Sequence, residues 1–403
     1  MGARPHLRVA DVFRSGWKAY RGAHRVGHRL AQVVRHIQVC RTAALGGRLH
    51  RCDTCHAEVP LYNSCRDRHC PTCQTLRKQR WLEQRRAEVL PVPYFHVVFT
   101  LPHALNPLIA ANRTLLLGEL FGTVNWVLQH FAADPQWKLC GQLGFIAVLH
   151  TWTQRLMPHY HLHCLVAGGA WNAGEQSWRT AHERYLFGKD ALAACFRARF
   201  IRRLESLRHR GRLHIDEEPA AWDALMRRLW QSKWIVYPKA TAKNPEQALD
   251  YLGRYTHRVA ISDHRILRIG SGPLCASAPP RENSPSVGSS HVTFAWRDRA
   301  DANREKTLTI PAADFIGRFL LHVLPRGFQK VRAFGWLAHR HKTATLAAIR
   351  AHLGAPPAAA PAGETPAARI LRLTGVDVTL CPVCKAGHLS YVGELPRARD
   401  GPA

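Results

Sequence analysis

Two Cys-x2-Cys pairs, separated by fourteen residues, constrain the fold of this chain more than any other feature of its sequence. Cys52 and Cys55 form the first pair, and Cys70 and Cys73 form the second. Four thiolates with this spacing can surround one tetrahedral Zn²⁺, as in a structural zinc ribbon. The sequence therefore predicts one zinc site at Cys52, Cys55, Cys70 and Cys73, with Cys65 and His69 of the same segment as alternative ligands.

A further group of candidate ligands lies near the end of the sequence. Cys381, Cys384 and His388 are close together, but three ligands make only an incomplete zinc knuckle. We expect either a second zinc site at these residues or a remnant that binds no metal.

The charge of the chain indicates a polyanionic partner. Its formal net charge is +29 over 403 residues, and nucleic acid is the usual partner of so basic a chain. An anionic membrane surface is the alternative, but no basic amphipathic helix or lipidation signal is evident. No signal peptide and no membrane-spanning run is found, so we expect a cytoplasmic protein that contacts DNA. In that compartment clustered cysteines favour metal binding over disulfides.

The distribution of residues along the chain predicts an α+β fold, in which helices flank an antiparallel sheet. Runs rich in β-branched and aromatic residues predict strands at 94–101, 143–152, 159–168 and 233–239. Helices are expected at 106–131, 190–209 and 219–232. We expect a helical and zinc-ribbon module at 1–90, a catalytic domain at 91–345, an Ala/Pro-rich linker at 346–368 and a short tail at 369–403.

Three histidines alternate along the predicted strand at 159–168. His159, His161 and His163 would point to one face, because side chains alternate along a strand. Three interpretations remain open. The first is chance in a chain with 25 histidines. The second is a metal-binding pair, His161 and His163, around one bulky apolar residue (an HUH pattern). The third is a histidine triad that forms a nucleotidyl intermediate without metal.

A pair of tyrosines follows in the stretch DYLGRYTHR. Tyr251 and Tyr255 are four residues apart, so on a helix they share one face. A tyrosine hydroxyl can attack a phosphodiester and form a covalent phosphotyrosine. The same spacing is typical of an ordinary core-facing helix. The basic setting favours the catalytic interpretation and suggests DNA contacts from Arg254, Arg258, Lys239 and Lys243.

Five blocks of sequence, in order, resemble a known family. They are YNSCRDRHCPTCQ, YFHVVFTLPH, HTWTQRLMPHYHLHCLVAGGA, YLGRYTHRVAIS and FLLHVLPRGFQKVRAFG. Together they resemble the two-tyrosine HUH transposases of the insertion-sequence-ninety-one family, which transpose by rolling circle in bacteria. The resemblance covers roughly residues 10–345. One departure is Asp263, which stands where relatives commonly carry Asn.

The resemblance implies both a fold and a set of functional residues. It implies a zinc-binding N-terminal module and an HUH endonuclease domain with an antiparallel sheet. The histidine pair of the family corresponds to His161 and His163, which would hold Mg²⁺ or Mn²⁺, and its tyrosine pair corresponds to Tyr251 and Tyr255. Many HUH enzymes have a third metal ligand, for which His96 is the candidate here, with Gln154 behind it.

The function implied by the resemblance is DNA transposition. The enzyme would nick single-stranded DNA at the ends of its element, retain a 5′-phosphotyrosine and leave a 3′-OH that primes the host replication machinery. A replication initiator or relaxase would use the same chemistry. A non-catalytic zinc-ribbon DNA-binding protein or a histidine-triad nucleotide hydrolase would also carry some of these motifs. The sequence does not specify the oligomeric state.

Overall fold

The fold was analysed in a computed structural model. It describes residues 7–215, 218–242, 247–248, 251, 253, 255–256, 258–270, 290–338, 341–357 and 364–398. Within this part of the chain, no helix is both long and apolar enough to cross a lipid bilayer.

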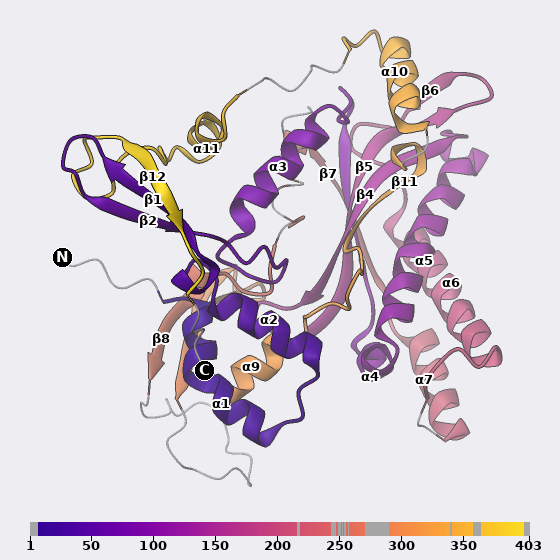
Figure 1. The fold of residues 1–403 in the computed structure, drawn as a ribbon. Coiled ribbons are helices and arrows are strands. Elements are labelled where there is room, and N and C mark those ends of the chain that lie inside the picture. Colours follow the sequence, from indigo (N-terminus) through magenta and orange to yellow (C-terminus); the bar gives the residue numbers. More distant parts are fainter. Residues whose placement is uncertain are drawn as a thin grey trace.

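The centre of the molecule is a six-stranded antiparallel sheet (Figure 1). Five strands follow one another in the order β11-β4-β5-β3-β7, and β6 pairs with the end of β5. In chain order the strands are β3 (Tyr94–Thr100), β4 (Gln142–Trp152), β5 (Pro158–Asn172), β6 (Ser177–Thr180), β7 (Ile235–Ala242) and β11 (Val331–Phe334). The predicted antiparallel sheet is confirmed, and β4 and β5 form an antiparallel hairpin.

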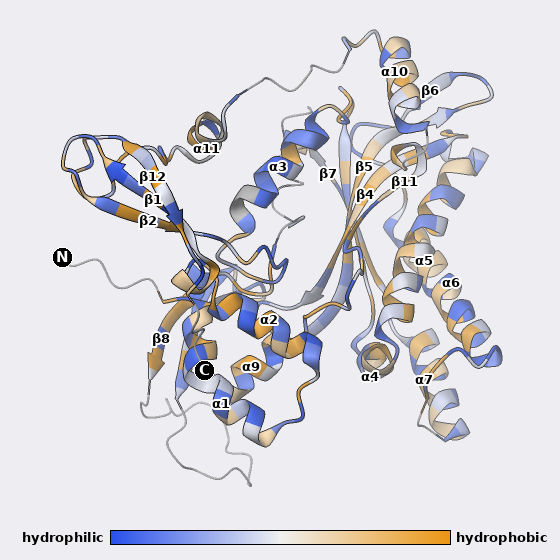
Figure 2. Cartoon of the chain, in the orientation of Figure 1, coloured by the Kyte–Doolittle hydropathy of each residue, from blue (hydrophilic) through white to orange (hydrophobic). Residues whose placement is uncertain are grey.

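The two faces of this sheet differ in chemistry. Side chains such as Phe95, Val97 and Phe145 form a large core with the helices on one face. These helices are α4 (Asn106–Ala111), α5 (Arg113–Ala133), α6 (Lys189–His209) and α7 (Pro219–Gln231). The alternate positions of the same strands carry histidines to the opposite face. Figure 2 shows the mostly hydrophobic strands beside the more hydrophilic helix α3 (Gln74–Arg86), which lies on that opposite side.

The single helix expected at 106–131 is two helices, α4 and α5. Asn112 separates them, with a backbone conformation (φ −119°, ψ 38°) outside the helical region. Its side-chain amide donates hydrogen bonds to the carbonyls of Leu108 and His214. The asparagine side chain thus links the break between the two helices to the backbone at His214.

A second unit packs below the sheet in the view of Figure 1. Helices α1 (Val9–Ala23) and α2 (His28–Gln38) share one hydrophobic core with α9 (Ala312–Leu320). A three-stranded antiparallel sheet completes this core, in the order β10-β9-β8, from β8 (Ile266–Gly270), β9 (His291–Asp298) and β10 (Arg304–Pro311). Residues 7–40 therefore pack mainly against residues 260–323.

The departure at Asp263 has a structural role. Its carboxylate accepts a hydrogen bond from the Val9 amide, at the first residue of α1, and another from the Thr72 hydroxyl. A carboxylate can accept both bonds at once, one on each oxygen. Asp263 therefore ties the N-terminal segment to the later part of the chain.

A third antiparallel sheet joins segments from both ends of the sequence. Its order is β12-β1-β2, with β1 (Gly47–Cys52), β2 (Glu58–Tyr62) and β12 (Leu389–Leu395). Figure 1 shows the yellow strand β12 beside the indigo strand β1. Two helices precede β12, namely α10 (Lys342–His352), which packs near the central sheet, and α11 (Pro366–Thr374).

Candidate active site

Strand register brings three histidines together on the face of the central sheet opposite α5 and α6. His161 and His163 alternate along β5, and His150 on β4 is the direct partner of His161. One nitrogen from each of the three rings lies within 4.8 Å of the others. All three side chains are buried, with at most 9% of each residue exposed. This arrangement could hold one divalent cation.

Each ring of the cluster is oriented through its other nitrogen. His161 donates from Nδ1 to the carbonyl of His159, and His150 donates from Nε2 to the carbonyl of Tyr255. Nδ1 of His163 is hydrogen-bonded to Nε2 of His96, at 2.8 Å. Metal-binding histidines are commonly held in this way by the nitrogen that does not bind the ion. Nε2 of His161, Nε2 of His163 and Nδ1 of His150 therefore remain to bind a metal.

Burial keeps these rings neutral. It lowers the pKa of His161 to about 3, and the pKa values of His150 and His163 also lie well below the usual range. Neighbouring histidines lower all three values further. A neutral imidazole has a lone pair available for a cation, so at pH 7 the cluster has the protonation state that metal binding requires.

The structure places His96 differently from the prediction that it is a third ligand. His150 completes the cluster, whereas His96 lies behind His163 and contacts the tyrosines. Gln154 lies beyond the end of β4, where its carbonyl accepts a hydrogen bond from Arg265. The register explains the difference, because β3 places His96 opposite Leu165, whereas β4 places His150 opposite His161. His159 lies outside the cluster, where it is hydrogen-bonded to His103 at 2.9 Å.

Both tyrosines point at the histidines from a helical segment that includes Gln247, Ala248, Tyr251, Gly253 and Tyr255. The Tyr251 hydroxyl lies 2.5 Å from Nδ1 of His96, and the Tyr255 hydroxyl donates to the Tyr251 hydroxyl at 3.3 Å. The Tyr255 ring stacks on His163, with 4.1 Å between ring centroids. Two phenolic hydroxyls and a histidine cluster that could bind a metal therefore share one pocket on the sheet.

Helix α3 covers the other side of the tyrosine segment. A Cβ atom at Gly253 would lie 2.9 Å from Leu82 and 3.1 Å from Lys78, both on α3. A glycine at this position therefore permits the close approach of the two helices. Tyr251 and Ala248 pack with Trp81 and Leu82 of α3 in one hydrophobic cluster.

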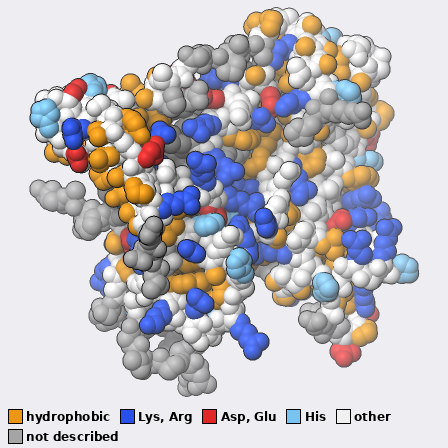
Figure 3. All heavy atoms as spheres, in the orientation of Figure 1, with side chains coloured by type: hydrophobic (Ala, Val, Ile, Leu, Met, Phe, Trp, Pro, Cys, Tyr) orange, Lys and Arg blue, Asp and Glu red, His pale blue; other side chains and the backbone are white. Residues whose placement is uncertain are grey.

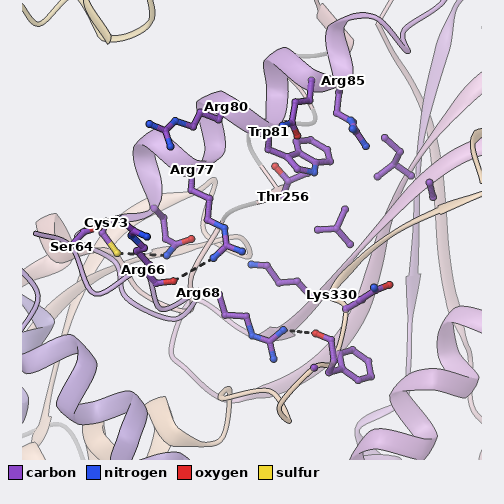
Figure 4. Close-up of a pocket in the computed structure, with 18 of the residues that line it drawn as sticks. Ser64, Arg66, Arg68, Cys73, Arg77, Arg80, Trp81, Arg85, Thr256 and Lys330 are labelled. Carbon is purple, nitrogen blue, oxygen red and sulfur yellow. Dashed lines mark hydrogen bonds between the residues drawn. The ribbon is translucent and has the colours of Figure 1, made fainter. Parts of the chain in front are cut away.

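A basic groove lies between α3 and the central sheet. It has a volume of about 1130 Å³, and it contains eight Lys and Arg side chains and no acidic one among its described lining residues. Figure 3 shows basic side chains gathered on this face of the molecule. In Figure 4, Arg77 and Trp81 extend from α3 toward the space that Arg68 and Lys330 approach from the other side. The groove reaches Thr256, which follows the second tyrosine.

The cations of this groove differ in their availability to a ligand. Arg85 and Lys342 are both paired with Glu88, and Arg68 donates to the carbonyls of Pro325 and Phe328. Arg66, Arg77 and Arg80 have no carboxylate partner among the described residues. Burial and the nearby Arg68 and Arg77 lower the pKa of Lys330 to about 8. The groove therefore contains positive charge that the protein itself leaves unneutralised.

Two of the four residues predicted to contact DNA lie among the described residues. Arg258 lines a second cavity of about 740 Å³, together with Gly253 and residues from another face of α3. Lys239 lies on β7 directly opposite His96. Arg254 and Lys243 lie outside the described residues. The sequence also shows the basic run LRKQR, and arginine-rich helices were expected to hold DNA, but no arginine of α3 or of the loop before it was among the four named residues.

The predicted four-cysteine site is split between two clusters, which corrects the prediction. Cys70 and Cys73 group with Cys65 and with Cys40 from the end of α2. Cys52 and Cys55 group with Cys381 and Cys384. The reason is the path of the chain, because the hairpin of β1 and β2 carries the first pair away from the second. Cys40 was overlooked, since it lies 25 residues before its nearest partner along the chain.

Two of the other predicted ligands have different partners. Nε2 of His69 accepts a hydrogen bond from the Leu324 amide, and Nδ1 donates to Asp67. The ring of His388 is hydrogen-bonded to the Thr379 hydroxyl and is not part of either cysteine cluster. Cys65, by contrast, is a member of the first cluster, with its Sγ 3.8 Å from Sγ of Cys73.

Comparisons with known proteins find family models and relatives that match this chain. Residues 144–344 match a family model described as "Putative transposase", and residues 12–101 match one described as "Transposase zinc-binding domain". The chain is 39% identical over 397 residues to "Putative transposase y4qJ" of Sinorhizobium fredii, covering 96% of this chain and 95% of the relative. It is 28% identical over 326 residues to the transposase for insertion sequence element IS801 of Pseudomonas savastanoi pv. phaseolicola, covering 77% and 70%. No solved structure matches.

Proposed function

Because this chain belongs to the IS91 family of two-tyrosine transposases, we propose that it nicks and rejoins single-stranded DNA through its own tyrosines. One observation carries the proposal: two tyrosine hydroxyls lie against a cluster of three neutral histidines. A nucleophile beside a candidate metal site is the arrangement that phosphodiester transfer requires.

His150, His161 and His163 are the residues that would hold the divalent cation. Such an ion, when bound, would polarise the scissile phosphate and offset its negative charge. Three imidazoles and no carboxylate fit Mn²⁺ better than Mg²⁺, because imidazole is the softer donor. We therefore expect Mn²⁺ to support activity better than Mg²⁺.

Tyr251 is the proposed first nucleophile. Its hydroxyl is 2.5 Å from Nδ1 of His96, and burial lowers the pKa of His96 to about 4, so that ring is neutral at pH 7. With a cation on Nε2 of His163, Nδ1 of that ring donates to Nε2 of His96, so His96 carries its proton on Nδ1 and donates to the Tyr251 oxygen. In the step, the phenolic oxygen forms a bond to phosphorus while the bond from phosphorus to the 3′-oxygen breaks. The Tyr251 proton passes to water while the N–H of His96 holds the phenolic oxygen in place, and the leaving oxygen takes a proton from water to become a 3′-OH. Tyr255 then remains available for a second strand.

The basic groove is the proposed path of the DNA strand. It begins beside the tyrosine segment and follows α3, where Arg66, Arg77 and Arg80 can contact successive phosphates. Trp81 adds an aromatic surface to its wall. Phosphate contacts combined with aromatic surface are typical of proteins that bind single strands without strong sequence preference.

The test is formation of a covalent protein–DNA adduct. Single-stranded oligonucleotides copied from both ends of the surrounding element would be incubated with the full chain and Mn²⁺ or Mg²⁺. A denaturing gel would compare wild type with Tyr251→Phe, Tyr255→Phe, the double variant and His161→Ala. His159→Ala is the matched control, since His159 is on the same strand but outside the cluster.

We expect an adduct that needs metal, His161 and at least one tyrosine, with the larger loss in Tyr251→Phe. The His159→Ala control should retain the adduct. No adduct from wild type with either end and either metal would favour a DNA-binding protein without catalysis. Metal-independent cleavage of small nucleotides would favour a histidine-triad hydrolase.

A further inference from the structure

The sheet formed by β1, β2 and β12 has almost no hydrophobic core of its own. None of its strand residues belongs to the three hydrophobic clusters among the described residues. Several of its large apolar side chains are exposed, including Leu61, Tyr391 and Val392. So small a sheet needs another source of stability, and a metal ion or a disulfide is the usual one.

Four cysteines lie at the end of this sheet, two from each end of the chain. Cys52 and Cys55 come from the turn between β1 and β2, and Cys381 and Cys384 come from the turn before β12. The Sγ atoms of Cys52 and Cys384 are 3.7 Å apart, and those of Cys55 and Cys381 are also 3.7 Å apart. A tetrahedral zinc with bonds of about 2.3 Å separates its sulfurs by about 3.8 Å. A disulfide would require about 2.05 Å.

The two Cys-x2-Cys turns have matching backbone geometry. In the first turn the amides of Thr54 and Cys55 donate to Sγ of Cys52, and in the second the Gly387 amide donates to Sγ of Cys384. His56 and Lys385, each directly after the second cysteine of its turn, both have a φ of 57°. Amide donors aimed at sulfur favour the thiolate form, which is the form that binds metal.

The turns also fit closely against one another. The Asp53 amide donates to the His388 carbonyl, and the His388 amide donates to the Asp53 carboxylate. A Cβ atom at Gly387 would lie 2.4 Å from Thr54 Oγ1 and 2.6 Å from Cys52 Sγ. Cys52 and Cys381 are each only 1% exposed. Two local turns from opposite ends of the sequence thus form one four-sulfur site, in which Cys384 is half-buried and Cys55 is exposed.

We propose that Cys52, Cys55, Cys381 and Cys384 bind a structural zinc ion that holds the C-terminal strand β12 to the N-terminal hairpin. This zinc is distinct from an ion at Cys40, Cys65, Cys70 and Cys73. Half of its ligands lie beyond both matched family regions, which end at residues 101 and 344. The C-terminal segment is therefore part of the zinc module and not a free tail.

The tail is held at a second place as well. Arg372 of α11 is ion-paired with Glu83 of α3 and with Glu364. The Arg372 side chain is partly exposed, so these ion pairs contribute little to stability on their own. We therefore expect the ordering of β12 to depend on the zinc and on pairing with β1.

The experiment is the zinc content of the purified full chain, measured by elemental analysis and native mass spectrometry. Wild type should carry two zinc ions per chain, and Cys381→Ser/Cys384→Ser should carry one. Cys140→Ser/Cys195→Ser is the matched control, because both cysteines lie outside the two clusters. It should keep two ions. Hydrogen exchange should speed up in β12 of the first variant and stay unchanged in α1.

Three outcomes would overturn the proposal. The first is two zinc ions retained in Cys381→Ser/Cys384→Ser. The second is a single ion in wild type that this variant keeps. The third is loss of four titratable thiols in denatured, unreduced wild type, which would indicate disulfides at these positions. None of these readouts depends on DNA cleavage, so the result is independent of the proposed catalytic function.

Discussion

At the scale of single residues, the partner of one ring nitrogen decides what each histidine can do. His159, His161 and His163 follow one another along β5, but only the last two belong to the cluster. His159 lies nearer the strand end and bonds His103. His96 has both nitrogens engaged, one with His163 and one with Tyr251. It is therefore placed to act on the nucleophile and not to bind an ion.

Replacing His96 tests this assignment. We expect His96→Phe to lower the rate of adduct formation by about 10²–10³-fold at saturating Mn²⁺, because the Tyr251 oxygen loses the N–H that stabilises its developing charge. Affinity for Mn²⁺ should fall by about 10–100-fold, since His163 loses its orienting partner. His96→Gln, which can still donate a hydrogen bond, should recover part of the rate. An unchanged rate in His96→Phe would exclude this role.

At the scale of elements, α3 links the cysteine cluster to the catalytic pocket. Its first residue, Gln74, directly follows Cys73, and its middle packs on Gly253 between the tyrosines. The helix is polar around most of its surface, so packing alone holds it weakly. Its position is set by the cysteine cluster at one end and by the tyrosine segment along its length.

Removing charge from α3 should weaken binding of single-stranded DNA. We expect Arg77→Ala/Arg80→Ala to reduce the slope of log affinity against log salt by about 1–2. Each phosphate contact releases counterions from the DNA when it forms, so a variant with fewer contacts releases fewer of them. Fluorescence anisotropy at several salt concentrations measures this slope. Arg184→Ala/Arg202→Ala removes the same charge far from the groove and should leave the slope near that of wild type. Equal slopes in both variants would argue against the groove.

At the scale of the whole molecule, polar contacts join the N-terminal unit to the central sheet. Arg68 donates to carbonyls of the 325–328 segment, and His69 accepts from Leu324. His322 donates from Nε2 to the Leu156 carbonyl and is hydrogen-bonded to the Thr151 hydroxyl. His69 and His322 are buried and Arg68 is half-buried, so each contact matters more than it would at the surface.

The hydrogen bonds of His322 make the contact between the N-terminal unit and the central sheet sensitive to acid. Burial lowers the pKa of His322 to about 4, below the value of about 6.5 in an unfolded chain. The unfolded state then binds more protons, so the stabilisation is present above pH 6.5 and is lost as the pH falls toward 4. Between pH 7 and pH 5.5, wild type should lose about 1 kcal/mol of unfolding free energy relative to His322→Gln. Urea denaturation at both pH values measures this difference, and a constant difference would contradict it.

The sequence by itself determined the local geometry of this protein. Alternation along 159–168 predicted that His161 and His163 share a face, and each Cys-x2-Cys pair predicted a metal-binding turn. These features depend on residues two or three positions apart, which the covalent chain places directly. The α+β class and the strands β3, β4, β5 and β7 were predicted for the same reason, because hydrophobic periodicity is local.

Only the tertiary structure decided which local features meet. Tetrahedral coordination needs four sulfurs but does not specify their order along the chain, so the partners of Cys52 and Cys55 depended on where β12 pairs. In the same way, the position of His150 beside His161 depended on strand register, and the groove depended on how α3 lies across the sheet. Contacts between residues far apart in sequence depend on helix packing and strand pairing, and a local sequence pattern does not specify either.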